Sequence, residues 1–208
     1  MNVVEVIVAA ILCTILFFLT FSITDKKEEY GAKQINVIGI MLLIITFLVG
    51  MRQQEVTTIE VRILTNIILY GLSVLTVTDI KKQYVPNKFL VYLLVAWATC
   101  VWICIIFNTE YGVVLLAKSL IGAIVGGGVF LLCYILSHKQ IGAGDVKLVF
   151  VMGLFLTGDR IIGAIFYGVL LCSLYSLIQM VRKRLNMKDG VPLVPFLTLG
   201  TVVTLFIL

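Results

Sequence analysis

The sequence predicts an all-α polytopic membrane protein, a bundle of about eight transmembrane helices in a single integral membrane domain over residues 1–208. Of the 208 residues, 61% are hydrophobic and only 13% are charged, whereas soluble domains carry roughly 45–50% apolar and about 25% charged residues. The apolar residues gather in long runs, and none of these runs alternates as the strands of a membrane β-barrel do. An ordinary cytosolic enzyme and a disordered scaffold are therefore excluded.

Each apolar run is interpreted as one membrane-spanning helix, because backbone groups in lipid must form their hydrogen bonds within the protein. In chain order the runs are Val3–Ile23, Ile35–Met51, Ile63–Thr78, Phe89–Phe107, Ser119–Ser137, Val146–Thr157, Ile161–Met180 and Val191–Leu208. The first run is too long for a signal peptide and lacks its basic start and cleavage site, so we expect it to remain as a span. We expect residues 1–58 to form an N-terminal part with two spans and residues 59–208 to form a core with six.

The basic residues predict how the spans are oriented. Twelve of the sixteen Lys and Arg lie in or beside the connections after the first, third, fifth and seventh runs, and the other four lie in the remaining connections. Because cytoplasmic loops are rich in Lys and Arg, the first set is predicted to be cytoplasmic, with both termini outside. The net charge of +5 has the same origin, so a nucleic-acid partner is not expected.

The sixth run, Val146–Thr157, is unusually short. Its residues would rise only ~18 Å as a helix, against a hydrocarbon core of ~30 Å. Either this helix starts deeper than usual, or the preceding stretch Ile141–Gly144 lies in a water-accessible notch. Non-helical backbone at membrane depth is tolerated only within protein or beside water. The sequence thus predicts one short or broken helix and a cavity on the cytoplasmic side.

Two aspartates differ from most acidic residues, because they adjoin apolar runs: Asp79 ends the third run and Asp145 opens the sixth. Structural explanations exist for each, since Asp145 suits a helix N-cap and Asp79 could pair with Lys81 or Lys82. Their coincidence at one predicted depth favours a function. Two neighbouring carboxylates cannot both ionise easily. The ionised one can then take a proton from water while the protonated one polarises a carbonyl.

The two aspartates lie in patterns with defined spacing. Asp79 opens a D-x6-P-N pattern, and Asp145 lies in the G-x-G-D-x-K-L pattern that begins at Gly142. A segment bracketed by two prolines opens the last run. In this order and spacing, from about Ile63 to Leu208, the chain resembles the prepilin peptidase family, membrane aspartic proteases named for their GxGD motif. The resemblance implies that Asp79 and Asp145 are the catalytic pair. The supporting residues that it implies are Gly142, Gly144, Lys147, Pro86, Asn87, Pro192 and Pro195.

Each kind of supporting residue has a physical task in this interpretation. Gly142 and Gly144 permit backbone dihedrals closed to other residues and leave room for a substrate backbone. Lys147 either holds one aspartate ionised or binds lipid phosphate at the interface, and the sequence leaves both open. Pro86 ends the polar turn before the fourth run. The two prolines of the last run are expected to break the start of its helix and to loosen the packing at that end.

The chain also departs from larger members of the family. Those proteins carry a cytoplasmic domain between their first two spans, with a C-x-x-C…C-x-x-C zinc site associated with N-methylation. Here the connection is only Thr24–Gln34 and contains no Cys. We therefore expect a short form of the family, with no metal, no cofactor and no methyltransferase activity.

The resemblance implies an endopeptidase in the inner (plasma) membrane that removes the leader of type IV prepilins or pseudopilins. The substrate's apolar helix would lie in the lipid bilayer, and cleavage would occur at the cytoplasmic face. A proton-coupled transporter that uses the same aspartates is the alternative, although it expects inverted internal repeats that are not evident here. An inactive assembly factor is a third hypothesis. The sequence indicates neither the identity of the pilin, nor which aspartate acts as the acid, nor the oligomeric state.

Overall fold

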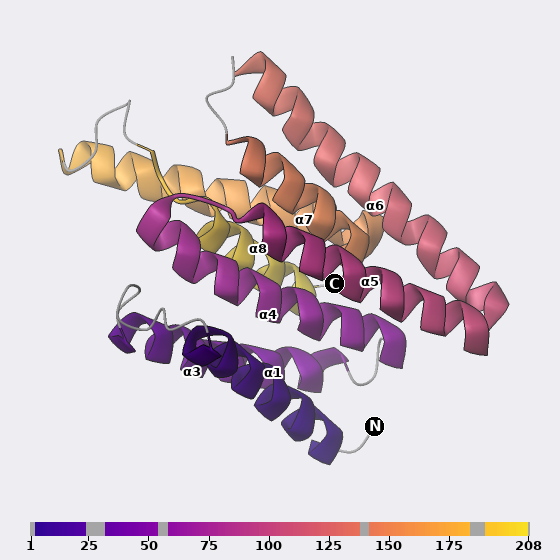
Figure 1. Cartoon of the computed structure of the whole chain (residues 1–208). Helices are drawn as coiled ribbons and strands as arrows, with labels where there is room; N and C mark the ends of the chain where they lie inside the picture. The colour runs from indigo at the N-terminus through magenta and orange to yellow at the C-terminus, as the bar shows by residue number, and fades with distance from the viewer. Residues whose placement is uncertain (1–2, 24–31, 54–57, 138–141, 184–189, 208) are drawn as a thin grey trace.

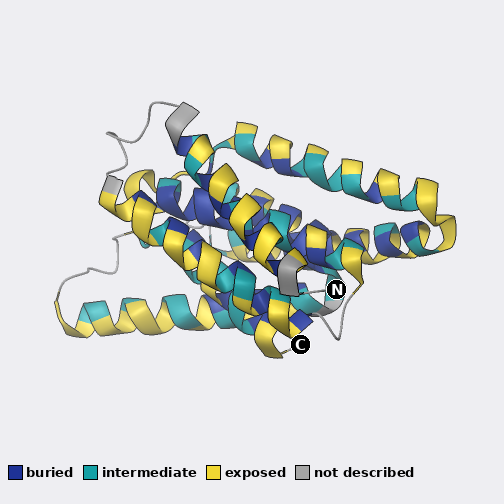
Figure 2. Ribbon diagram, turned by 90° about the horizontal axis from the view of Figure 1, so that it is seen from below, coloured by how far each residue is buried: buried dark blue, intermediate teal, exposed yellow. Residues whose placement is uncertain are grey.

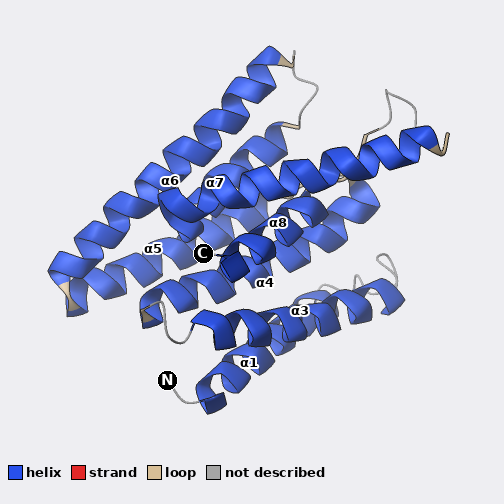
Figure 3. Ribbon diagram, turned by 180° about the vertical axis from the view of Figure 1, so that it is seen from behind, coloured by secondary structure: helices blue, strands red, loops and turns tan. Residues whose placement is uncertain are grey.

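The computed structural model describes residues 3–23, 32–53, 58–137, 142–183 and 190–207. Within these residues every regular element is an α-helix and no strand occurs (Figure 3). The helices are α1 (Val3–Ile23), α3 (Ala32–Gln53), α4 (Ile59–Lys82), α5 (Asn87–Phe107), α6 (Thr109–Leu136), α7 (Ala143–Val181) and α8 (Val194–Ile207). Among the described residues, five helical segments are long and apolar enough to cross a membrane. The predicted all-α polytopic architecture is confirmed.

Helix α4 is the most enclosed of these spans. Of an apolar stretch of 18 residues in α4, 72% is buried, compared with 17% of the corresponding stretch in α5. Leu64, Ile68, Leu72 and Leu75 form a buried stripe along α4, at the spacing of one helix face. Helices α1 and α3 pair on one side of α4, and α7 and α8 lie on the other (Figure 1). The outer helices keep exposed faces, many of them apolar, as a bilayer solvent permits (Figure 2).

Helix α7 consists of two arms that fold back on each other. Thr157 interrupts it with φ 62° and ψ 177°, which is not a helical conformation. Asp145 lies on the first arm and Cys172 on the second, yet both line one cavity. A straight helix would separate them by ~40 Å, so the chain must reverse at Thr157 (Figure 1). The predicted short sixth span and seventh span correspond to these two arms, and the first arm begins at Ala143.

Glycines allow the arms of α7 to approach their neighbours closely. A Cβ at Gly122 of α6 would collide with the backbone of Gly153 and Thr157. A Cβ at Gly200 of α8 would collide with the backbone of Ala164. Backbone approach of this kind is how membrane helices gain packing contacts without a hydrophobic driving force. These glycines therefore hold the reversed helix in place within the bundle.

Two boundaries bear on the site. Helix α8 begins at Val194 rather than at Val191, and Pro195 lies in its first turn, where the missing N–H of proline costs no helical hydrogen bond. Helix α4 begins at Ile59, where the six-span core is predicted to begin. The division of the chain at this point stays a prediction.

Candidate active site

A cavity of about 630 Å³ lies among the ends of α4, α5 and α7 and the segment before α8. Six of the predicted site residues line it, namely Asp79, Asp145, Gly142, Gly144, Lys147 and Asn87. The three predicted prolines are not part of its lining, although Pro86 is the N-cap of α5 and Pro192 lies between two lining residues. The fold thus brings together residues of segments 79–87 and 142–147, although Asp79 and Asp145 are 66 positions apart in the sequence.

Asp79 lies in the last turn of α4 and is 5% exposed. Its carboxylate oxygen Oδ2 accepts a hydrogen bond of 2.9 Å from the backbone N–H of Val194, the first residue of α8. Amides at a helix N-terminus have no partner within their own helix and favour negative charge. The Asp79 carboxylate thus binds the N-terminus of a helix. Lys81, one of the two partners that the sequence suggested for it, does not take that place.

The backbone around Asp79 explains how α4 ends there. Gln83 is the C-cap in the left-handed conformation, with φ 47°, and its N–H donates to the backbone oxygen of Asp79 at 2.8 Å. The Gln83 side chain then donates from Nε2 to the backbone oxygen of Gly190 at 2.7 Å. This contact ties the turn after α4 to the segment before α8. It therefore supports the placement of Val194 beside Asp79.

Asp145 lies in the first turn of α7 and is partly buried. The N-cap of this helix is Gly142, so Asp145 is not the cap that the sequence allowed; its own N–H donates to the Gly142 oxygen at 3.0 Å. Burial, and next the charge of Asp79, raise the pKa of Asp145 from 3.8 to about 6, while the Gly142 backbone acts in the opposite direction. The two carboxylates are thus electrostatically coupled across the cavity.

The two glycines of the motif provide room rather than unusual dihedrals. Gly142 has φ −65° and ψ 133°, an extended conformation that any residue adopts. A Cβ on Gly142 would lie 3.1 Å from Oδ2 of Asp145, and one on Gly144 would lie 3.2 Å from Cβ of Val85. Side chains at these positions would press on the carboxylate and on the turn after α4. The close approach, rather than backbone freedom, is what requires glycine here.

Lys147 contacts neither aspartate among the residues that the structure describes. Its Nζ donates to Oδ1 of Asn87 at 3.2 Å, joining the first turn of α7 to the start of α5. The G-x-G-D-x-K-L pattern and the P-N pair, predicted separately, therefore meet at the edge of the cavity. This hydrogen bond is exposed, which leaves Lys147 accessible to a ligand in the cavity or at the membrane surface.

Several lining residues were not singled out by the sequence. Gln83 and Tyr84 lie within the D-x6-P-N pattern but occupy its variable positions, and Cys172 lies in an apolar run where packing is the simplest explanation. Val194 acts through its backbone N–H, for which no side-chain pattern gives a signal. The reversal at Thr157 brings Cys172 to the cavity, and that reversal is a tertiary property.

Comparison with known proteins assigns the chain that carries these residues to a family. The family model described as type IV leader peptidase family matches residues 66–177, more than half of the chain, and the match contains both aspartates. The chain belongs to the type IV leader peptidase family. It is a multi-pass membrane member of that family, with several long apolar helices.

Curated relatives agree with this assignment. A prepilin leader peptidase/N-methyltransferase of Bacillus subtilis (strain 168) is 28% identical over 131 residues, which cover 63% of this chain and 50% of that protein. A protein of the same name from Escherichia coli (strain K12) is 29% identical over 140 residues, covering 63% of this chain and 57% of that protein. The chain spans about half the length of the curated relatives it matches. No solved structure matches the chain.

Proposed function

We propose that this chain is a membrane aspartic endopeptidase that removes the leader of type IV prepilins or pseudopilins, with Asp79 and Asp145 as the catalytic pair. The observation that carries the proposal is the arrangement of these two carboxylates, which lie on different helices, line one cavity and are coupled in charge. Family membership supports the same reaction class. Neither relative is named as a transporter, so the proton-coupled alternative gains no support.

The surroundings of the two aspartates favour different roles. Burial favours the protonated form of Asp79 as well as that of Asp145, and the Val194 N–H at the start of α8 opposes this effect at Asp79; Asp79 would therefore be the first of the two to ionise and would act as the general base. The raised pKa of Asp145 favours its protonated form, which would act as the general acid. Water would lose a proton to Asp79 and attack the peptide carbonyl carbon as Asp145 protonates the carbonyl oxygen. Collapse of the tetrahedral intermediate would break the C–N bond, with the proton on Asp79 passing to the leaving amine and one hydroxyl proton of the intermediate returning to Asp145 as the carbonyl reforms.

Charge distribution supports cleavage at the cytoplasmic face. The ends of α4 and α5 at the cavity carry Lys81, Lys82 and Lys88, and Lys147 lies in the cavity lining. Connections rich in Lys and Arg are retained in the cytoplasm. A leader that stays in the cytoplasm would therefore reach the cavity without crossing the bilayer.

The decisive experiment is co-expression of the chain with a type IV prepilin and measurement of the cleaved fraction over time. Asp79→Asn and Asp145→Asn should each slow cleavage by at least about 100-fold, because each removes one proton-transfer group. Glu110→Gln is the matched control, since this exposed carboxylate lies at the start of α6 and outside the cavity. Wild-type cleavage by either aspartate variant, at equal amounts in the membrane, would contradict the catalytic pair.

We also propose that the chain has no methyltransferase activity of its own. The proposal rests on the connection between the first two predicted spans, which has no Cys; its residues 24–31 lie outside those that the structure describes. Mass spectrometry of the mature pilin tests it. A methyl group added to the new N-terminus when the purified chain cleaves a prepilin in the presence of S-adenosylmethionine would contradict the proposal.

A further inference from the structure

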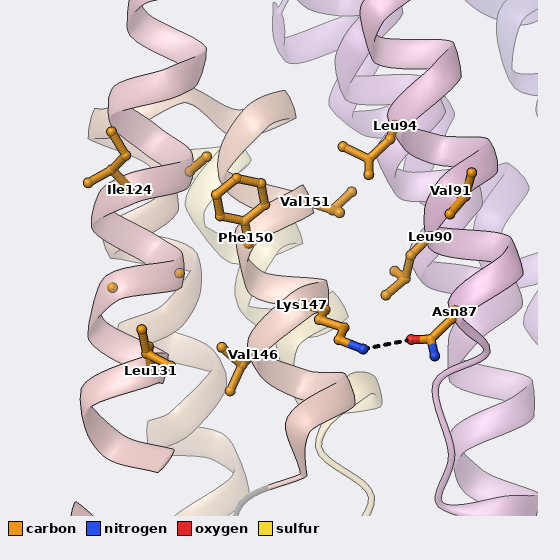
Figure 4. Close-up of a pocket in the computed structure, with 13 residues that line it drawn as sticks. Asn87, Leu90, Val91, Leu94, Ile124, Leu131, Val146, Lys147, Phe150 and Val151 are labelled. Carbon is orange, nitrogen blue, oxygen red and sulfur yellow. Dashed lines mark hydrogen bonds between the residues drawn. The ribbon is translucent and has the colours of Figure 1, made fainter. Parts of the chain in front are cut away.

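A second, apolar groove runs along the outside of the bundle between α5 and α6, with the first arm of α7 as its floor (Figure 4). Its volume is about 550 Å³. Leu90 and Leu94 on α5 and Ile124 and Leu131 on α6 form its walls, and Phe150 projects from α7 between them (Figure 4). Of the residues that line the groove, only Asn87 and Lys147 have polar side chains.

The groove leads to the candidate active site. Asn87 and Lys147 line both the groove and the cavity that contains the two aspartates. They are joined by the 3.2 Å hydrogen bond drawn in Figure 4. A ligand lying along the apolar part of the groove would therefore pass this polar pair as it enters the cavity.

The dimensions of the groove suit a helix. Its α6 wall extends from Ala123 to Leu131, a rise of ~12 Å, or about two turns of a docked helix. Gly127 and Gly128 lie in this wall. A Cβ on Gly127 would meet Phe150, but a Cβ on Gly128 would meet no atom of the described chain within 4 Å. Internal packing therefore does not explain glycine at position 128, whereas the close approach of a second helix does.

We infer that this groove seats the apolar helix of the substrate, with the peptide bond that precedes the helix extended past Asn87 and Lys147 toward Asp79 and Asp145. The inference rests on the proposed peptidase function. A substrate segment in the bilayer must be helical, because its backbone groups have no water to bind. An apolar groove that opens into the cavity gives such a helix a place beside the bundle and directs only its end to the aspartates. Docking here selects substrates that carry an apolar helix directly after the cleavage site.

The matched pair Gly128→Trp and Val129→Trp tests the groove. Both variants place the same side chain on adjacent residues of α6, but Val129 is 44% exposed and does not line the groove. Two substrates are compared: a full-length prepilin in membranes, and a short leader peptide that spans the cleavage site and lacks the apolar helix. Gly128→Trp should slow cleavage of the full-length prepilin by about tenfold or more, because its scissile bond is displaced from the aspartates. Cleavage of the short peptide should not change, and Val129→Trp should act as wild type on both substrates.

Two outcomes of this experiment overturn the inference. One is equal cleavage of the full-length prepilin by the two Trp variants. The other is an equal loss of both substrates with Gly128→Trp, because the effect would then not depend on the substrate helix. If the wild-type chain cleaves neither substrate, the proposed function itself fails.

Photo-crosslinking tests occupancy of the groove without requiring cleavage. Benzoylphenylalanine is placed at Leu131, which lines the groove, or at Leu132, which is 62% exposed and does not. The inference expects crosslinks from position 131 to the apolar helix of the prepilin, and few from position 132. Crosslinks to lipid alone, or equal crosslinking to the prepilin from both positions, overturn it. Because the readout is contact, it separates failure of the groove from failure of the peptidase.

Discussion

The carboxylate of Asp79 accepts a 2.9 Å hydrogen bond from the backbone N–H of Val194, a residue 115 positions further along the chain. This contact joins the end of the central helix α4 to the start of the last helix α8. It gives a buried carboxylate a backbone N–H donor. The same contact makes Asp79 part of the support of α8 as well as part of the candidate active site.

Removal of the Asp79 acceptor should loosen the start of α8. Asp79→Asn keeps an oxygen that can accept from Val194, whereas Asp79→Ala does not. We expect Asp79→Ala to be less stable than Asp79→Asn by about 1 kcal/mol, the usual cost of a lost helix cap. Thermal unfolding in detergent measures the difference, and hydrogen exchange should show faster exchange at the Val194 amide in the Ala variant. Equal exchange at this amide in both variants would contradict the contact.

The raised pKa of Asp145 should make the stability of the protein fall as the pH rises. Its folded pKa of about 6 lies above its ordinary value of 3.8, so the folded state binds more protons between these values. The stabilisation is fully present below about pH 4 and is lost as the pH rises through about 6, a change of roughly 3 kcal/mol. Unfolding measured across this range should show the decline, and Asp145→Asn should make it smaller. A wild-type profile as flat as that of the variant would count against the shift.

Cleavage should also depend on the proton of Asp145. If Asp145 is the general acid, the active fraction falls as the pH rises above about 6, by up to about tenfold per pH unit at the most alkaline values. Initial rates of cleavage of a short leader peptide, measured from pH 5 to 9 in detergent, test this. The observed midpoint belongs to the coupled pair of aspartates rather than to one residue. A rate that stays constant from pH 6 to 8 would exclude this role.

Two glycines of α6 should respond oppositely to the same substitution. The added Cβ of Gly122→Ala collides with the backbone of Gly153 and Thr157, which cannot turn aside as a side chain can. We expect a loss of about 1–3 kcal/mol of stability. Gly128→Ala meets no atom of the described chain within 4 Å and should be neutral or slightly stabilising, because alanine favours helix. Parallel thermal unfolding of the two variants is the measurement, and equal midpoints would contradict the close approach of α6 and α7.

The reversal of α7 at Thr157 stores backbone strain that glycine should relieve. The φ of 62° and ψ of 177° belong to a region that is costly for residues with a Cβ, by about 1–3 kcal/mol. Thr157→Gly removes this strain but adds about 1 kcal/mol of unfolded-state entropy, so we expect a net gain of about 1 kcal/mol. Thr157→Ala keeps the strain and serves as the control. A Gly variant less stable than the Ala variant would show that the reversal is not strained.

Much of the fold was accessible from the pattern of apolar residues. The run that ends at Thr78 became α4, and the short run beginning at Val146 became the first arm of α7. The start of α8 was placed too early, at Val191, because apolar composition continues through Pro192 while the helix itself does not begin until Val194. Apolar composition indicates which residues lie in lipid, but it does not indicate the residue at which the helix begins.

The apolar runs and the spacing of the acidic residues were enough to predict that this chain spans a membrane, and which two carboxylates to examine. A bilayer requires long apolar helices, and placing a charged side chain in it costs free energy. An aspartate at the end of such a helix is therefore a candidate functional residue. The packing of the helices in three dimensions is what places Asp145 and Cys172 in one cavity, brings the Val194 amide to Asp79, and forms an apolar groove beside them. Each of these depends on how helices distant in sequence pack and where α7 reverses. Local patterns do not encode those relations, because they arise from contacts between segments.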